Sequence, residues 1–130
     1  MGEEDRSISA DTVRYLRLSD TEIISRPYGR LYLISARDAG LKNLQALLMV
    51  IEPGKRTSKH YHPSEEIFFV VKGEALFNSR VLSQQVKAQD TIIVPSNEPH
   101  QIENISATES CEILITLSPP RKPEQVTYCE

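Results

Sequence analysis

The stretch "PGKRTSKHYHPSEEIFFVVKGE", residues 53–74, decides how this chain is interpreted. It contains two of the three histidines in the sequence, His60 and His62, and Glu66 follows four positions after the second. Residues two apart on an extended chain project from the same face, so both imidazoles point into one space. Pro63 then interrupts the strand and lets the chain bend before the next apolar run.

The apolar run that follows predicts a strand with one buried face. Glu66, Phe68 and Val70 alternate along it, and if the two apolar side chains face the core, the carboxylate does too. A buried carboxylate must be paired or bound to a metal. The third histidine, His100, begins another short strand, "HQIEN". Three inward imidazoles and one inward carboxylate predict a site for a divalent metal.

The sequence also indicates the surroundings of this site. Glu65 is expected in solvent, and Phe68 and Phe69 are expected in the core. Cys111 is interpreted as a small buried hydrophobe, because nothing in the sequence would lower the pKa of its thiol.

Length and composition predict one domain, residues 1–130, with a core over about residues 30–118, an N-terminal arm and a proline-rich tail. Apolar residues make up 39% and charged residues 25% of the 130, as in soluble domains. No apolar run approaches the ~20 residues of a membrane span. The acidic start lacks the apolar segment of a signal peptide, so we expect a cytoplasmic protein that does not bind membranes. Two cysteines are too few for a disulfide framework.

The charge pattern argues against a nucleic-acid partner. The formal net charge is −3, and no block of Lys and Arg is present. The nearest basic cluster, Lys55, Arg56 and Lys59, flanks the histidines. It is either a solvated loop or a rim that attracts an anionic ligand.

Short apolar runs bounded by turn formers predict an all-β protein. Turn signals every eight to twelve residues are typical of an antiparallel sandwich or barrel. The two runs on either side of Lys72-Gly73 predict a hairpin. Residues 11–20 could form a strand or a helical turn, residues 38–47 could hold a helical turn, and the tail is expected over the surface or a partner. The expected strands cover residues 30–35, 45–52, 66–71, 74–78, 81–89, 90–95, 100–104 and 111–117.

With these residues in view, the chain resembles the cupins. The first cupin motif, G-x5-H-x-H-x3–4-E-x6-G, is matched at every position, by Gly54, His60, His62, Glu66 and Gly73. The second motif, G-x5-P-x-G-x2-H-x3-N, is matched by Pro95, His100 and Asn104.

Two glycines of the second motif are replaced. Asn97 is a mild change, because Asn tolerates the left-handed backbone that glycine often supplies in a turn. Gln89 is expected to make its turn differently. Neither change touches an expected metal ligand.

The resemblance implies a double-stranded β-helix, or jelly roll, whose two sheets enclose one divalent metal ion. The implied ligands are His60, His62, Glu66 and His100. In a six-coordinate ion these leave two open positions, which suits iron, manganese, nickel or cobalt. Zinc could instead form a closed tetrahedral, structural site with the same four groups.

With open positions, such a metal can activate a chelated substrate or dioxygen. The resemblance therefore implies a metal-dependent enzyme acting on an oxygen-rich small molecule, as a dioxygenase or as an isomerase or cyclase. The alternatives are a non-catalytic binding or sensor cupin and a structural cupin. No general base is identified, because all three histidines are used; the tyrosines and Glu52, Glu74, Glu98 and Glu103 remain. Small single-domain cupins are commonly homodimers, so a homodimer is also implied.

Overall fold

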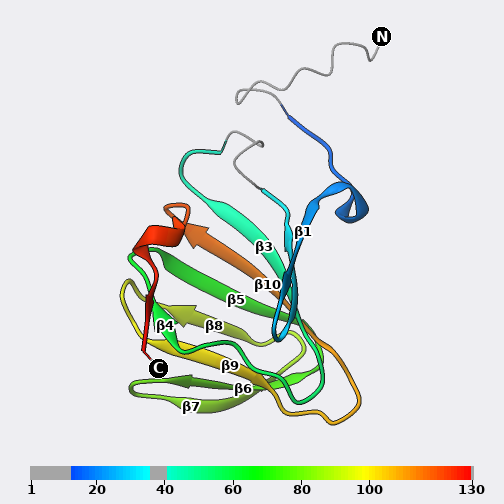
Figure 1. The fold of residues 1–130 in the computed structure, drawn as a ribbon, viewed down its shortest axis with the longest axis vertical. Coiled ribbons are helices and arrows are strands. Elements are labelled where there is room, and N and C mark those ends of the chain that lie inside the picture. The colour runs from blue at the N-terminus through cyan, green and yellow to red at the C-terminus, as the bar shows by residue number, and fades with distance from the viewer. Residues whose placement is uncertain (1–12, 36–40, 130) are drawn as a thin grey trace.

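Two antiparallel sheets make up nearly all of the computed structural model, which describes residues 13–35 and 41–129 (Figure 1). One sheet has six strands in the order β1-β2-β3-β10-β5-β8, and the other has five in the order β11-β4-β9-β6-β7. The first sheet consists of β1 (Glu22–Arg26), β2 (Gly29–Leu33), β3 (Gln45–Ile51), β10 (Cys111–Ser118), β5 (Glu65–Lys72) and β8 (Thr91–Val94). The second consists of β11 (Thr127–Tyr128), β4 (His60–Tyr61), β9 (His100–Asn104), β6 (Glu74–Ser79) and β7 (Ser83–Lys87).

The hydrophobic core lies between the two sheets and confirms the predicted jelly roll. Strand β5 shows the principle, since its residues alternate between exposed and buried from Glu65 to Val71. Phe68 packs edge-on against Phe77 across the sandwich, with ring centroids 6.0 Å apart. The most buried core side chains are Leu47, Ile51, Val70, Val94, Ile102, Ile113 and Leu117.

The predicted hairpin at Lys72-Gly73 is wrong. Strands β5 and β6 do not pair; they belong to different sheets, and Gly73 carries the chain from one sheet to the other. Gly73 has a φ of 92°, and a Cβ there would lie 2.8 Å from the carbonyl oxygen of Ser110. The glycine is needed for a crossing between sheets, where backbones pass closely, and not for a two-residue turn.

The replaced motif glycines both keep a left-handed backbone. Gln89 has a φ of 78° and Asn97 a φ of 63°. The expectation of a differently built turn at Gln89 is therefore wrong, because this residue adopts the conformation that glycine takes without cost.

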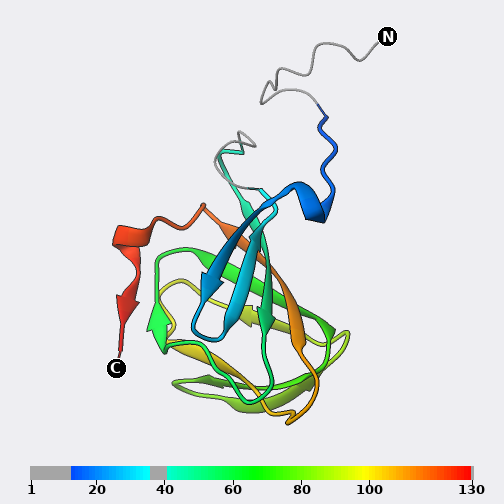
Figure 2. The same ribbon diagram turned by 45° about the vertical axis from the view of Figure 1, so that its right-hand side comes forward.

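Both ends of the described chain add strands that the sequence did not predict. At the N-terminal end a 3₁₀ turn, Leu18–Asp20, precedes β1, which pairs with β2 through a loop of two residues, Pro27 and Tyr28. At the C-terminal end a 3₁₀ turn, Pro123–Gln125, precedes β11, which pairs with β4. The tail thus lies along β4 of its own chain (Figures 1 and 2).

The helical turn expected within residues 38–47 is not formed where the structure describes it. Residues 41–44 are irregular and β3 begins at Gln45. Residues 38–40 and the N-terminal arm up to residue 12 lie outside the described residues. No helix in the described part of the chain is long and apolar enough to cross a membrane.

Candidate metal centre

The three histidines come together because β4 and β9 are neighbours. His60 in β4 is directly paired in register with His100, the first residue of β9. His62 follows β4 immediately, where the chain leaves the five-stranded sheet. The chain then enters the six-stranded sheet, and its second residue there is Glu66 in β5. The site is therefore built at one end of the sandwich, where the two sheets are joined.

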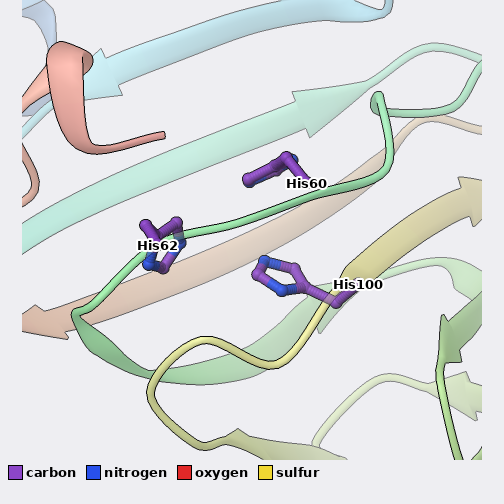
Figure 3. Close-up of side chains that lie close together, drawn as sticks. All are labelled: His60, His62 and His100. Carbon is purple, nitrogen blue, oxygen red and sulfur yellow. The ribbon is translucent and has the colours of Figure 1, made fainter. Parts of the chain in front are cut away.

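Figure 3 shows the three imidazole rings gathered around a common space. Their ligand atoms all lie within 4.8 Å of one another. Glu66 extends the cluster, because its Oε1 lies 3.0 Å from Nε2 of His62 and 3.0 Å from Nε2 of His100. His62, His100 and Glu66 are almost completely buried.

Each ring is held by a backbone carbonyl two residues away. Nδ1 of His60 lies 2.9 Å from the oxygen of Ser58, and Nδ1 of His62 lies 3.1 Å from that of Ser64. Nδ1 of His100 lies 2.8 Å from the oxygen of Glu98. A carbonyl only accepts, so each Nδ1 carries the hydrogen. In the neutral rings Nε2 is then left with a free lone pair, the state in which a histidine binds a metal.

Three atoms at the centre lack a hydrogen bond within the described part of the chain: Nε2 of His62, Nε2 of His100 and Oε1 of Glu66. Buried polar atoms without a partner cost free energy. Here all three are electron-pair donors directed at one another, an arrangement that a cation among them would stabilise. The residues present therefore fit a metal ion, and the three histidines could hold one.

The protonation states favour the same interpretation. Burial lowers the pKa of His60 to about 4, so its ring is neutral at neutral pH. Burial alone would raise the pKa of Glu66, but its contacts with His100 and His62 outweigh burial and set it at about 2. The ring of His60 and the carboxylate of Glu66 are thus in the forms that bind divalent metals.

A cavity of about 490 Å³ adjoins the centre, and His60, Glu66 and His100 are part of its wall. This volume is within the ~300–1,000 Å³ of small-molecule sites. The apolar part of the remaining wall includes Leu31, Leu47, Met49, Phe68, Ile102 and Ile115. Any metal held by the histidines would face a space large enough for a small organic molecule.

The four residues predicted from the two motifs do meet at one place. The expected exposure of Glu65 and burial of Phe68 are confirmed, whereas Phe69 is 38% exposed on the outer face of the sheet. Phe69 cannot share the core with Phe68, because neighbouring strand residues face opposite sides. Cys111 is fully buried in the core, and burial raises the pKa of its thiol to about 11.

Four polar residues of the cavity wall were not singled out from the sequence. Arg26 and Tyr28 come from the β1–β2 hairpin, and Arg121 and Tyr128 come from the tail. Arg56, from the basic cluster, also lines the cavity. None of the unassigned carboxylates does so. Only Arg56 belonged to a cluster that is visible in the sequence. The other four residues had no such signal, since no motif links the two ends of a chain.

Residues 47–117 match the family model of the cupin domain. This match covers more than half of the chain, and it includes the three clustered histidines and Glu66. The chain belongs to the cupin family.

The chain is also similar to individual proteins. It is 32% identical to auxin-binding protein 4 of Zea mays in an alignment of 109 residues that covers 73% of this chain and 53% of that protein. It is 36% identical to the uncharacterized protein MJ1618 of Methanocaldococcus jannaschii over 88 residues, 66% of this chain and 70% of that protein. The chain spans about half the length of the auxin-binding relatives it matches.

Among solved structures, the polyketide cyclase RemF from Streptomyces resistomycificus superposes with a TM-score of 0.76 at 17% identity. The match covers 92% of this chain and 87% of that one. At this identity the likeness shows the shared cupin fold alone.

Proposed function

We propose that the protein is a metal-dependent cupin enzyme that acts on an oxygen-rich small molecule. The reaction would be that of a dioxygenase or of an isomerase or cyclase. One observation carries this proposal: buried Nε2 and carboxylate atoms without hydrogen bonds converge at the wall of a cavity large enough for a substrate.

The proposed ligands are His60, His62, His100 and Glu66. The fourth ligand is supported by the 3.0 Å contacts of its carboxylate with two of the imidazoles. A divalent ion in this set (iron, manganese, nickel, cobalt or zinc) would supply Lewis-acid or redox chemistry.

The chain's own residues would orient the substrate and exclude water from it. The apolar wall displaces solvent around the body of a bound molecule. Burial raises the pKa of Tyr28, so its hydroxyl stays protonated and can donate a hydrogen bond or a proton into the cavity. No carboxylate other than Glu66 lines the cavity in the described part of the chain. The proposal therefore assigns no separate general base.

Metal analysis of freshly purified protein is the first test. We expect about one divalent ion per chain in the wild type, and a large loss of metal in His100→Ala and Glu66→Gln. Glu65→Gln is the matched control, because this neighbouring carboxylate is exposed. A wild-type protein that binds no divalent metal under any loading condition would overturn the proposal.

Turnover is tested separately. Protein reconstituted with Fe(II) without oxygen is mixed with catechols, diketones or thiols, and oxygen uptake is measured. Uptake that depends on His100 supports a dioxygenase. Absence of uptake with all of them removes that reaction and leaves isomerisation or cyclisation, which product analysis detects.

A non-catalytic binding protein is the alternative. The similarity to auxin-binding proteins favours it, because their name describes binding and not turnover. A ligand recovered unchanged after long incubation with metal-loaded protein would support this alternative. Proteins that only bind would also show no oxygen uptake.

We further propose that the chain forms a homodimer and that it acts in the cytoplasm as a single domain. The dimer is supported by an apolar row on the outer face of the six-stranded sheet. In this row Ile23 pairs with Tyr32, Tyr32 with Leu48, Leu48 with Leu114, and Leu114 with Phe69.

A further inference from the structure

Three arginines line the cavity beside the metal centre. Arg26 comes from the end of β1, Arg56 from the loop after β3, and Arg121 from the C-terminal tail. Arg26 and Arg121 are more than 90 residues apart in the sequence, yet all three arginines border one cavity. Within the described part of the chain, none of these guanidinium groups forms a salt bridge.

The charge of the cavity is opposite to that of the whole chain. Three positive side chains line the cavity, and among the described residues Glu66 is the only carboxylate of its wall. A divalent ion in the centre would add two further positive charges. The chain as a whole carries a formal net charge of −3. A cavity of one sign with apolar walls concentrates its field on the ligand.

Tyr28 lines the same cavity as Arg26 and Arg121. The positive charges of Arg26 and Arg121 both act on its half-buried hydroxyl. Arg121 and His60 line the same cavity, so this arginine borders the space beside the metal centre. Both guanidinium groups act only as hydrogen-bond donors. The Tyr28 hydroxyl can also donate when its hydrogen points towards the anion, so all three groups can bind an anion.

The rest of the wall defines the other part of the ligand. Leu31, Leu47, Met49 and Ile115 provide aliphatic surface from three adjacent strands of the six-stranded sheet. A small polar anion such as free phosphate would leave this surface in contact with water. A molecule with an apolar body would cover it.

We propose that the cavity binds an organic acid whose apolar body lies on this aliphatic wall and whose carboxylate is held by Arg121, Arg26 and Tyr28. A planar guanidinium matches a carboxylate with two parallel hydrogen bonds, which favours this anion. The inference rests on the proposed function in one respect only: the end of the ligand opposite its carboxylate would reach the metal.

Binding of such an acid would connect the two ends of the described chain. Arg26 belongs to the N-terminal hairpin, whereas Arg121 belongs to the tail that pairs with β4 through β11. A carboxylate held by both would hold the tail against the hairpin. The acid should therefore slow hydrogen exchange of the backbone amides in residues 121–129.

The test uses three probes of the same shape: 3-phenylpropanoate, its uncharged amide, and 2-phenylethyl phosphate. Affinities are measured calorimetrically on metal-free and on metal-loaded protein. We expect the acid to bind about tenfold or more tightly than the amide in both forms, because a charge-assisted hydrogen bond is lost in the amide. Arg121→Gln should lower the affinity for the acid by a similar factor and leave the affinity for the amide unchanged.

Two variants serve as controls. Lys122→Gln removes the neighbouring positive charge, which does not line the cavity, and should bind the acid like the wild type. Arg121→Lys keeps the positive charge but loses the planar guanidinium that forms two parallel hydrogen bonds. Its affinity for the acid should therefore lie between those of the wild type and Arg121→Gln.

Several results would overturn the inference. These are equal affinity for acid and amide, equal effects of Arg121→Gln and Lys122→Gln, no binding of any probe at millimolar concentration, or tighter binding of the phosphate. Because the metal-free protein is measured too, failure of the metal site would show as absent metal and would leave the arginine result intact.

Discussion

At the scale of single residues, the centre depends on backbone carbonyls that orient each imidazole. The carbonyls of Ser58, Ser64 and Glu98 fix the hydrogen on Nδ1, so the ligand atoms face inward before any ion is present. Such support usually determines how well a metal site is formed. The motif spacing thus sets both the ligands and the loops that hold them.

His60 should make the metal-free protein sensitive to acid. Its pKa is about 4 in the folded chain against an ordinary 6.5, so the unfolded chain binds more protons between these values. The neutral His60 ring therefore contributes to the free energy of unfolding in full above pH 6.5, and this contribution is lost as the pH falls towards 4. In His60→Gln the free energy of unfolding should fall less steeply there, by up to about 1.4 kcal/mol per pH unit.

Urea denaturation at a series of pH values measures this difference. Above pH 7 the two proteins should show parallel curves, which provides the internal control. Equal slopes between pH 6.5 and 4 would contradict the assigned role of His60.

Gly73 should be the least replaceable of the motif glycines. In Gly73→Ala the left-handed φ and the close contact with Ser110 act together, so we expect a loss of about 3 kcal/mol. Gly54→Ala is the matched control. Gly54 has a φ of 73° but nothing within 4 Å of an added Cβ, so only about 1 kcal/mol should be lost. Thermal unfolding of both variants checks the order, and equal losses would show that the crossing between sheets tolerates a side chain.

At the scale of elements, the tail is a wall of the cavity as well as a strand. It is attached at several points: the Ser64 hydroxyl donates to the carbonyl of Pro119, and the amide of Arg121 donates to the Gln45 side chain. Further along, Tyr128 pairs with His60 in register, and their ring centroids are 5.9 Å apart. The tail therefore helps to bury the most accessible of the three histidines.

Truncation after Lys122 should test this element. The removed residues 123–130 contribute no side chain to the buried core of the described structure, so the shortened chain should still fold. The pKa of His60 should rise from about 4 towards its ordinary value, because burial is the main cause of its shift. An NMR titration of the histidine in metal-free protein measures the change. Tyr128→Ala, which keeps the backbone pairing, should produce a smaller rise, and an unchanged pKa in the truncated chain would contradict the role of the tail.

At the scale of the whole molecule, the two faces of the six-stranded sheet differ in what covers them. The inner face packs on the core, whereas the outer face leaves large apolar side chains uncovered in the single chain. Ile67, Phe69 and Val71 on β5 are 46%, 38% and 45% exposed, and Ile93 on β8, paired with Ile67, is 76% exposed. A contiguous apolar surface of this kind is typical of a protein interface.

The proposed homodimer should therefore depend on Ile93. Wild-type protein should sediment as a dimer, and Ile93→Asp should shift it towards the monomer, because burying an unpaired carboxylate is costly. Val81→Asp is the matched control, since Val81 is 83% exposed in the turn between β6 and β7, on the other sheet. A monomeric wild type would end the proposal, and equal effects of the two substitutions would move the interface elsewhere.

Local spacing was sufficient for the centre and for most strands. His60, His62 and Glu66 could be predicted because a period of two assigns strand residues to one face. His100 could be predicted for the same reason, since it begins a short strand within the second motif. Phe69 was placed in the core against this period, and the structure shows it on the outer face. The all-β class followed from short apolar runs between turn formers.

Local patterns were enough to assign the side chains that point inward, because the geometry of one strand decides that. The packing of the two sheets was needed to show that Gly73 joins them and that the tail of the chain closes a cavity beside its N-terminal hairpin. It also brought Arg26, Tyr28 and Arg121 to the same wall. Such meetings depend on how whole sheets pack, and no periodicity within a single segment encodes which distant segment will lie against it.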